Sequence, residues 1–67
     1  MPTPEYTNSQ IERLIDEHIH NDRDRMILKD RLIDGLTYEV IAERYFLSVN
    51  HTKNIVYKAQ NKLFKYL

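Results

Sequence analysis

Five polar side chains near the C-terminal end have the types that read the edges of DNA bases. They are Asn50, His51, Lys53, Asn54 and Tyr57. An asparagine amide can pair with both N6 and N7 of adenine, and a lysine can donate to O6 and N7 of guanine. These residues therefore predict contacts with double-stranded DNA in its major groove. For Asn50, which lies close to a predicted helix start, helix capping is an equally good interpretation.

A second set can contact the DNA backbone, because its members carry a positive charge or a hydroxyl group. These residues are Arg44, Ser48, Lys58, Lys62 and Lys65. Each cation that neutralises a phosphate releases counterions, so the set predicts a salt-sensitive affinity for DNA. The alternative for the lysines is a solvated helix face. For Arg44 it is an ion pair with Glu39 or Glu43.

Two arginines further upstream, Arg23 and Arg25, are also candidates for phosphate contact. Asp22 and Asp24 stand beside them in the sequence. These acids at the start of a predicted helix favour an ordinary ion-paired helix start over a DNA contact.

The charges are divided between the two parts of the chain. Residues 1–43 hold ten acids and five basic residues, a net charge of −5, whereas residues 44–67 hold five basic residues and no acid, a net charge of +5. Acids in the second part would repel phosphates, so their absence agrees with the predicted DNA contacts.

Four helices are predicted to position these side chains. Apolar residues at helical spacing indicate helices over residues 8–20, 22–34, 37–45 and 49–66, after a flexible arm at 1–7 that contains both prolines. Gly35 is the expected left-handed stop of the second helix. The expected N-caps are residues with a side-chain oxygen: Thr7 or Ser9, Asn21 or Asp22, Thr37, and Ser48.

The fold class that follows is all-α. We expect one small four-helix domain over residues 1–67, with a helix-turn-helix core at 37–58 and no winged elements. Ala42 is the small residue expected where the two helices of this core touch. At about 100° per residue, the last helix is expected to turn one arc toward the core. That arc contains Thr52, Ile55, Val56, Ala59, Leu63 and Tyr66.

The sequence resembles region 4 of bacterial sigma factors, the module that reads the −35 promoter element. The resemblance is carried by the segments RDRMIL at 23–28, GLTYEVIAE at 35–43, LS at 47–48, KA at 58–59 and KL at 62–63. LuxR-type DNA-binding domains share the same core, and their turn is similar to RYFLS at 44–48. The resemblance implies a helix-turn-helix that binds DNA.

Two departures from the sigma pattern concern the turn and the start of the last helix. Phe46 stands where sigma factors usually have a glycine that permits an unusual backbone, although LuxR-type domains tolerate phenylalanine there. His51 and Thr52 replace the usual Thr-Val pair. The 67 residues also leave no room for the region that binds core polymerase, so a complete sigma factor is not expected.

Catalysis, cofactors and metals are not expected. The chain has no cysteine, Gly-rich phosphate loop or nucleophile elbow. His18 and His20 point to different helix faces, and His51 lies far from both in the sequence. The longest apolar run is three residues, so no membrane span is predicted and we expect a cytoplasmic protein of a bacterial or phage-infected cell.

The predicted function is a sequence-specific transcriptional regulator that binds double-stranded DNA through the helix near 49–66. The alternative is a protein-interaction module that uses the same fold without reading DNA. Such a module would bind RNA polymerase or a sigma factor, or act as a phage-type inhibitor. A homodimer is an open possibility, because apolar residues gather near the C-terminus: Tyr57, Phe64, Tyr66 and Leu67.

Overall fold

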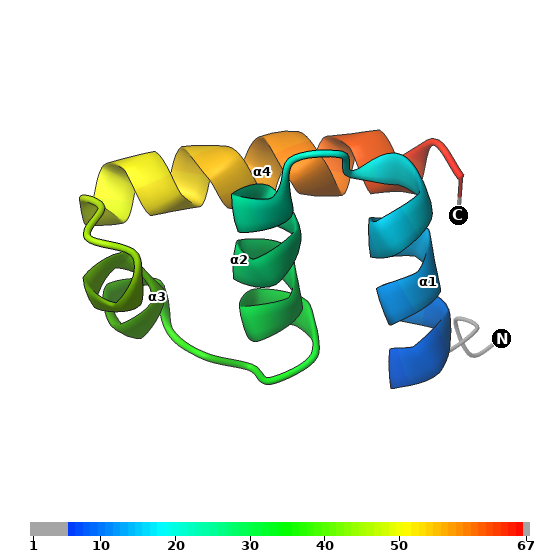
Figure 1. The fold of residues 1–67 in the computed structure, drawn as a ribbon, viewed down its shortest axis with the longest axis horizontal. Helices are drawn as coiled ribbons and strands as arrows, with labels where there is room; N and C mark the ends of the chain where they lie inside the picture. The colour runs from blue at the N-terminus through cyan, green and yellow to red at the C-terminus, as the bar shows by residue number, and fades with distance from the viewer. Residues whose placement is uncertain (1–5, 67) are drawn as a thin grey trace, which may run out of the picture.

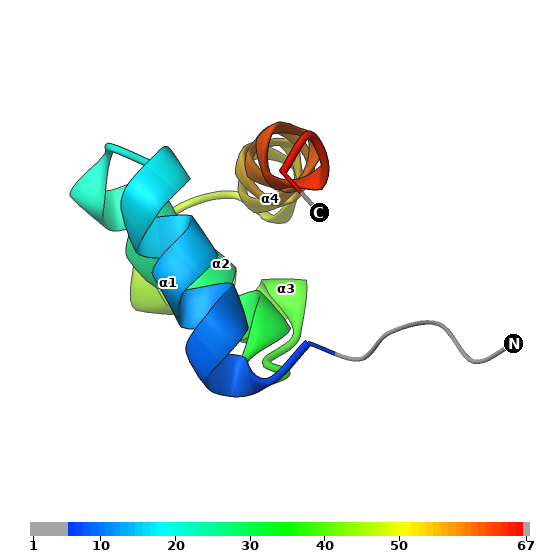
Figure 2. The same ribbon diagram turned by 90° about the vertical axis from the view of Figure 1, so that its right-hand side faces the viewer.

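Four helices make up the fold, and no strand occurs among residues 6–66, which are the residues that the computed structural model describes. The helices are α1 (Asn8–His18), α2 (Asp22–Leu32), α3 (Tyr38–Arg44) and α4 (Val49–Phe64). The last helix, α4, runs along one side of the molecule, and α1, α2 and α3 all pack against the same side of α4 (Figures 1 and 2). The prediction of an all-α, four-helix fold is confirmed.

Each helix begins at a residue whose side-chain oxygen accepts a backbone N–H of the first turn. Thr7 and Gln10 form a full capping box, with the Gln10 N–H 3.1 Å from Thr7 Oγ1 and the Thr7 N–H 2.8 Å from Gln10 Oε1. Asn21, Thr37 and Ser48 cap the other three helices. These bonds satisfy donors that have no partner within the helix, which is why the chain starts its helices there.

The helices end earlier than their sequence periodicity indicates. The first ends at His18 instead of residue 20, because Ile19 is extended (φ −107°, ψ 114°) and buried in the core. The second ends at Leu32 instead of residue 34, followed by Gly35 at φ 69° as expected. The last ends at Phe64 instead of residue 66.

The core is one cluster of aliphatic side chains to which α1, α2, α3 and α4 all contribute. It contains Ile15, Ile19, Ile27, Leu28, Ile41, Ile55, Val56, Ala59 and Leu63. The predicted inward arc of α4 is confirmed except for Tyr66, which is 57% exposed. Tyr66 lies beyond the end of α4, and its ring stacks on His18 with the centroids 3.6 Å apart.

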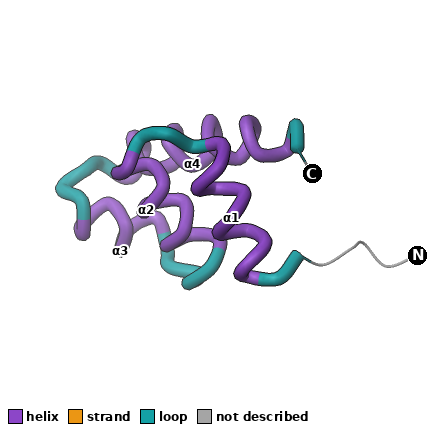
Figure 3. Tube along the Cα trace, turned by 45° about the vertical axis from the view of Figure 1, so that its right-hand side comes forward, coloured by secondary structure: helices purple, strands orange, loops and turns teal. Residues whose placement is uncertain are grey.

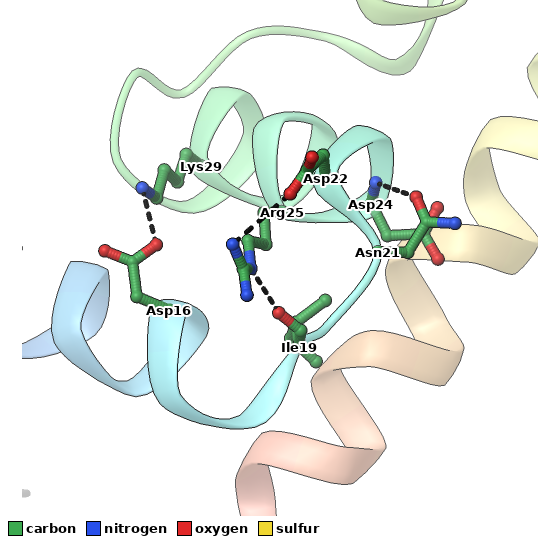
Figure 4. Close-up of polar contacts among 7 residues, drawn as sticks. All are labelled: Asp16, Ile19, Asn21, Asp22, Asp24, Arg25 and Lys29. Atoms are coloured by element: carbon green, nitrogen blue, oxygen red, sulfur yellow. Dashed lines mark hydrogen bonds and ion pairs between the residues drawn. The ribbon is translucent and has the colours of Figure 1, made fainter.

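Ion pairs hold α1 against α2 and close the corner between them (Figure 4). Lys29 Nζ on α2 lies 2.9 Å from Asp16 Oδ1 and 3.7 Å from Glu12 Oε1, both on α1. Arg25 pairs with Asp22 at 3.3 Å and donates to the Ile19 carbonyl. The ion-paired helix start predicted for this segment is confirmed.

None of the described helices is long and apolar enough to cross a membrane.

Candidate nucleic-acid interface

The crossing of α3 and α4 forms a helix-turn-helix. Ala42 is buried at the contact, as predicted, and the Leu47 N–H closes the turn by donating to the Ala42 carbonyl at 2.8 Å. Thr52 is fully buried at the position where an aliphatic residue is usual. Its hydroxyl donates to the Ser48 carbonyl at 2.9 Å, so the polar group is satisfied and the start of α4 stays packed.

The turn contains Phe46 in the left-handed backbone region, at φ 58°. This conformation is unfavourable for a residue with a side chain, which explains the usual glycine at this position. The Phe46 ring makes no stabilising contact with the core, because the residue is 95% exposed. A short loop joins α3 to α4 at this turn (Figure 3).

A groove of about 810 Å³ lies between α4 and the corner that joins α1 to α2. The wall from α4 brings together two predicted base-contact residues, His51 and Asn54, and three predicted backbone-contact residues, Lys58, Lys62 and Lys65. The opposite wall includes His20, Asn21, Arg23 and Asp24. Among residues 6–66, Asp24 is the one acid that lines the groove, and its Oδ1 is 3.6 Å from Arg23 Nε. The groove is therefore a concave surface with a basic α4 wall.

Two other predicted base-contact residues lie against Tyr38, the first residue of α3. Lys53 Nζ is 5.7 Å from the centre of the Tyr38 ring, and the Tyr57 ring meets it edge-on at 6.2 Å. Arg31 of α2 lies over the same ring at 4.5 Å. Hydrogen bonding with the Tyr38 side chain raises the pKa of the exposed Tyr57 phenol above its usual 10.0. Tyr38 therefore joins α2 and α3 to the outer face of α4.

Arg44 pairs with Asp30 of α2, not with the neighbouring Glu39 or Glu43. Its guanidinium Nη1 lies 3.2 Å from Asp30 Oδ2, and the same oxygen accepts the Tyr45 hydroxyl at 2.8 Å. Asp30 is buried, while the Arg44 side chain remains 53% exposed. The carboxylate charge raises the pKa of Arg44. For the Tyr45 phenol, burial raises the pKa most, followed by its bond to Asp30.

The sequence interpretation missed Asp30 and Tyr38, although both organise predicted contact residues. Asp30 follows Ile27 by three positions, which places an acid on the inward stripe of α2. That placement is a sequence signal for a buried, paired acid. No comparable signal exists for Tyr38, because its partners come from two other helices.

Ser48, the remaining predicted backbone contact, caps α4 by accepting the His51 N–H at 3.1 Å.

A separate apolar cavity of about 180 Å³ lies between the start of α1 and the end of α4. Its wall consists almost entirely of apolar side chains: Tyr6, Ile11, Leu14, Leu32, Leu63 and Phe64, with Gln60. None of the predicted DNA-contact residues lines it. The charged groove and this cavity are therefore two distinct surfaces of the molecule.

The family model for sigma-70, region 4, matches residues 21–65, a span that contains α2, α3 and α4. No curated protein and no solved structure matches the chain.

Proposed function

Because this chain belongs to the sigma-70 region 4 family, we propose that it is a sequence-specific regulator of transcription that binds double-stranded DNA. In this proposal the N-terminal half of α4 enters the major groove, as the second helix of a helix-turn-helix does. Domains of this family bind DNA and RNA polymerase. The proposed setting is the cytoplasm of a bacterial or phage-infected cell.

The observation that carries the proposal is the exposed face of α4. It presents amides, lysines and a phenol without a single acid, since residues 44–67 contain no Asp or Glu. Asn50, His51, Lys53, Asn54 and Tyr57 are the proposed contacts with base edges. Arg44, Ser48, Lys58, Lys62 and Lys65 are the proposed contacts with the backbone. Arg44 remains among the proposed contacts because its side chain is 53% exposed, although a phosphate would have to share the guanidinium with Asp30.

Binding to a random-sequence duplex across a salt series tests the proposal. Four cationic backbone contacts predict a slope of log affinity against log salt of about −3.6. Lys58→Ala should weaken binding to all sequences and flatten the slope by about one unit. Arg13→Ala, an exposed position on α1 outside the groove, is the control and should leave the slope unchanged. If no salt-dependent binding occurs at low ionic strength, the proposal is wrong.

A protein-interaction module is the second candidate, and the apolar cavity beside Phe64 is the observation that favours it. Phe64 is 61% exposed at the rim of a cavity lined by Ile11, Leu14 and Leu63. An exposed apolar patch of this kind is typical of protein contact sites. The partner would be RNA polymerase, a sigma factor or a second copy of the chain. Phe64→Ser should abolish such binding and leave the salt-dependent DNA affinity intact.

A further inference from the structure

The charged groove has two walls, and the proposed DNA contacts lie on only one of them. Five of these contacts are on the α4 wall, whereas the wall from the α1–α2 corner carries none. The lysines of the α4 wall extend from Lys58 to Lys65, about 10 Å along the helix axis. A row of cations of this length suits an extended sugar-phosphate strand better than a single small anion.

The groove is basic even though the α1–α2 corner belongs to the acidic part of the chain. Among residues 6–66, Asp24 is the one acid in its lining, and its Oδ1 lies 3.6 Å from Arg23 Nε. Four cations and one acid give the lining a net charge of +3 while its histidines are neutral. The field of the groove therefore attracts phosphate.

DNA held by α4 brings a phosphate backbone to this groove. A helix in the major groove lies between two sugar-phosphate backbones, because they form the edges of that groove. One backbone therefore passes on each side of α4 in the proposed complex. On one side α4 contacts Tyr38 of α3, and on the other it faces the α1–α2 corner across the charged groove. The backbone on the second side meets the corner as well as the lysines.

His20 is the corner residue whose charge can respond to that backbone. It follows the extended Ile19 in the loop between α1 and α2, and its side chain is exposed in the groove. Within residues 6–66 its ring makes no hydrogen bond or ion pair. A protonated imidazole is a cation with two N–H donors, and histidine changes its charge between about pH 5 and 8.

The other charged and titratable side chains near His20 come from α1, α2 and α4. They are Glu17 and His18 of α1, Arg23 and Asp24 of α2, and His51, Lys58, Lys62 and Lys65 beside or on α4. None of the acids and lysines in this set changes charge between about pH 5.5 and 8 at its ordinary pKa. His18 does not line the groove, since its ring stacks on Tyr66. His51 lines it from the opposite wall.

We infer that the charged groove seats one sugar-phosphate backbone of the bound duplex, and that His20 contacts its phosphates from the α1–α2 corner in the protonated form. The strand places negative charge beside the imidazole, so DNA binding and protonation of His20 favour each other. The gain in affinity is present below about pH 6 and is lost as pH rises through the histidine range. The inference rests on the proposed DNA-binding function and extends its contacts to a second element.

Salt series with one duplex at about pH 5.5 and about pH 8 test the inference. His51→Gln is the background, because His51 lines the same groove and titrates in the same range. Each further phosphate neutralised steepens the slope of log affinity against log salt by about 0.9. The background protein should show this increment at pH 5.5 relative to pH 8.

Three further variants in that background assign the increment. His20→Gln should lose it and keep the slope at pH 8. His20→Lys, which carries its charge at both pH values, should show the steep slope at both. His18→Gln is the matched control and should keep the increment, because His18 lies outside the groove. Circular dichroism at both pH values checks that each variant is folded.

The inference is overturned if the background protein has the same slope at both pH values. It is also overturned if His20→Gln keeps the increment or if His18→Gln loses it. In these cases salt-dependent binding at pH 8 persists and the proposed function stands. If no duplex is bound at either pH, both the inference and the proposed function are wrong.

Discussion

At the scale of single residues, Phe46 is a position where phenylalanine is doubly unfavourable. Its backbone is strained, and its side chain gains no stability from burial. Its backbone is left-handed (φ 58°) and its ring is 95% exposed. A left-handed backbone costs a residue with a side chain roughly 1–2 kcal/mol, and glycine avoids this cost at the expense of about 0.5–1 kcal/mol of chain entropy. The turn therefore contains conformational strain that no packing contact of Phe46 offsets.

Phe46→Gly should raise the free energy of unfolding by about 0.5–1 kcal/mol, because it relieves the left-handed strain and removes no buried surface. Thermal unfolding followed by circular dichroism measures the change. Phe46→Ala is the control, since it removes the ring and keeps the strained backbone. Equal stability of the glycine and alanine variants would show that the backbone conformation is not the cause.

At the scale of elements, buried Asp30 connects α2 to the helix-turn-helix. It accepts the Tyr45 hydroxyl and pairs with Arg44, so one carboxylate fixes the end of α3 and the start of the turn. A hydrogen bond to a charged group contributes about 1.5–3 kcal/mol. The position of α4 relative to α2 depends on this connection as well as on the aliphatic core.

The raised pKa of Tyr45 predicts a loss of stability at alkaline pH. Because the folded protein disfavours the phenolate, this contribution is fully present below pH 10.0, the usual pKa of tyrosine, and is lost as pH rises through the raised value. Urea unfolding between about pH 9 and 11 measures the effect. It is best measured in a Tyr57→Phe background, since the pKa of Tyr57 is also raised.

Tyr45→Phe should reduce this alkaline loss. At neutral pH it should lower the free energy of unfolding by about 1.5–3 kcal/mol, because the bond to the Asp30 carboxylate is lost. Tyr6→Phe removes a phenol outside this cluster and serves as the control. An unchanged alkaline slope in the Tyr45 variant would contradict the interpretation.

Tyr38 has a comparable connecting role on the other flank of α4. Its ring contacts Arg31 of α2 and both Lys53 and Tyr57 of α4. A cation over an exposed ring contributes about 0.5–1 kcal/mol, and an aromatic pair about 0.5–1.5 kcal/mol. The ring therefore restricts the two α4 side chains before DNA is bound.

Tyr38→Ala should change the DNA sequence preference in the same way as Tyr57→Ala, although Tyr38 itself reads no base in the proposed complex. Library selection with both variants measures this. Tyr38→Phe, which keeps the ring, should retain the wild-type preference. A uniform loss of affinity with unchanged preference would instead assign Tyr38 to the backbone contacts.

At the scale of the whole molecule, the end of α1 contacts the segment that follows α4. His18, the last residue of α1, stacks on Tyr66 beyond α4, with an angle of 4° between the rings. The contact holds the C-terminal end of α4, which carries Lys62 and Lys65, against the first helix. Tyr66 therefore packs against the His18 ring and not against the aliphatic core.

The stack should contribute about 0.5–1.5 kcal/mol to the free energy of unfolding. A double-mutant cycle of His18→Ala and Tyr66→Ala measures this coupling directly. Tyr66→Ala paired with the distant Val40→Ala is the control cycle and should give no coupling. Additive effects in the first cycle would mean that the stack adds no stability.

Much of the fold was predictable because the signals that set it are local. A capping oxygen bonds within three residues of itself, so Thr37 and Ser48 could be identified from the sequence, and Thr7 and Asn21 were each one of two candidates. Helical phasing likewise identified the buried arc of α4, since it depends only on spacing along one helix. The helix ends were less predictable, because Ile19 leaves α1 to enter a core that other helices supply.

The four helices, the acid-free outer face of α4 and the types of the proposed contact residues follow from the order of the amino acids alone. Which of those residues share a surface depends on how the helices pack together. This packing brought His51, Asn54, Lys58, Lys62 and Lys65 to one wall of a groove, and placed Lys53 and Tyr57 beside Tyr38. It also assigned Arg44 to Asp30, fourteen positions away in the sequence. The physical reason is that periodicity fixes the direction of a side chain about its own helix axis, whereas the crossing of helices fixes which side chains meet.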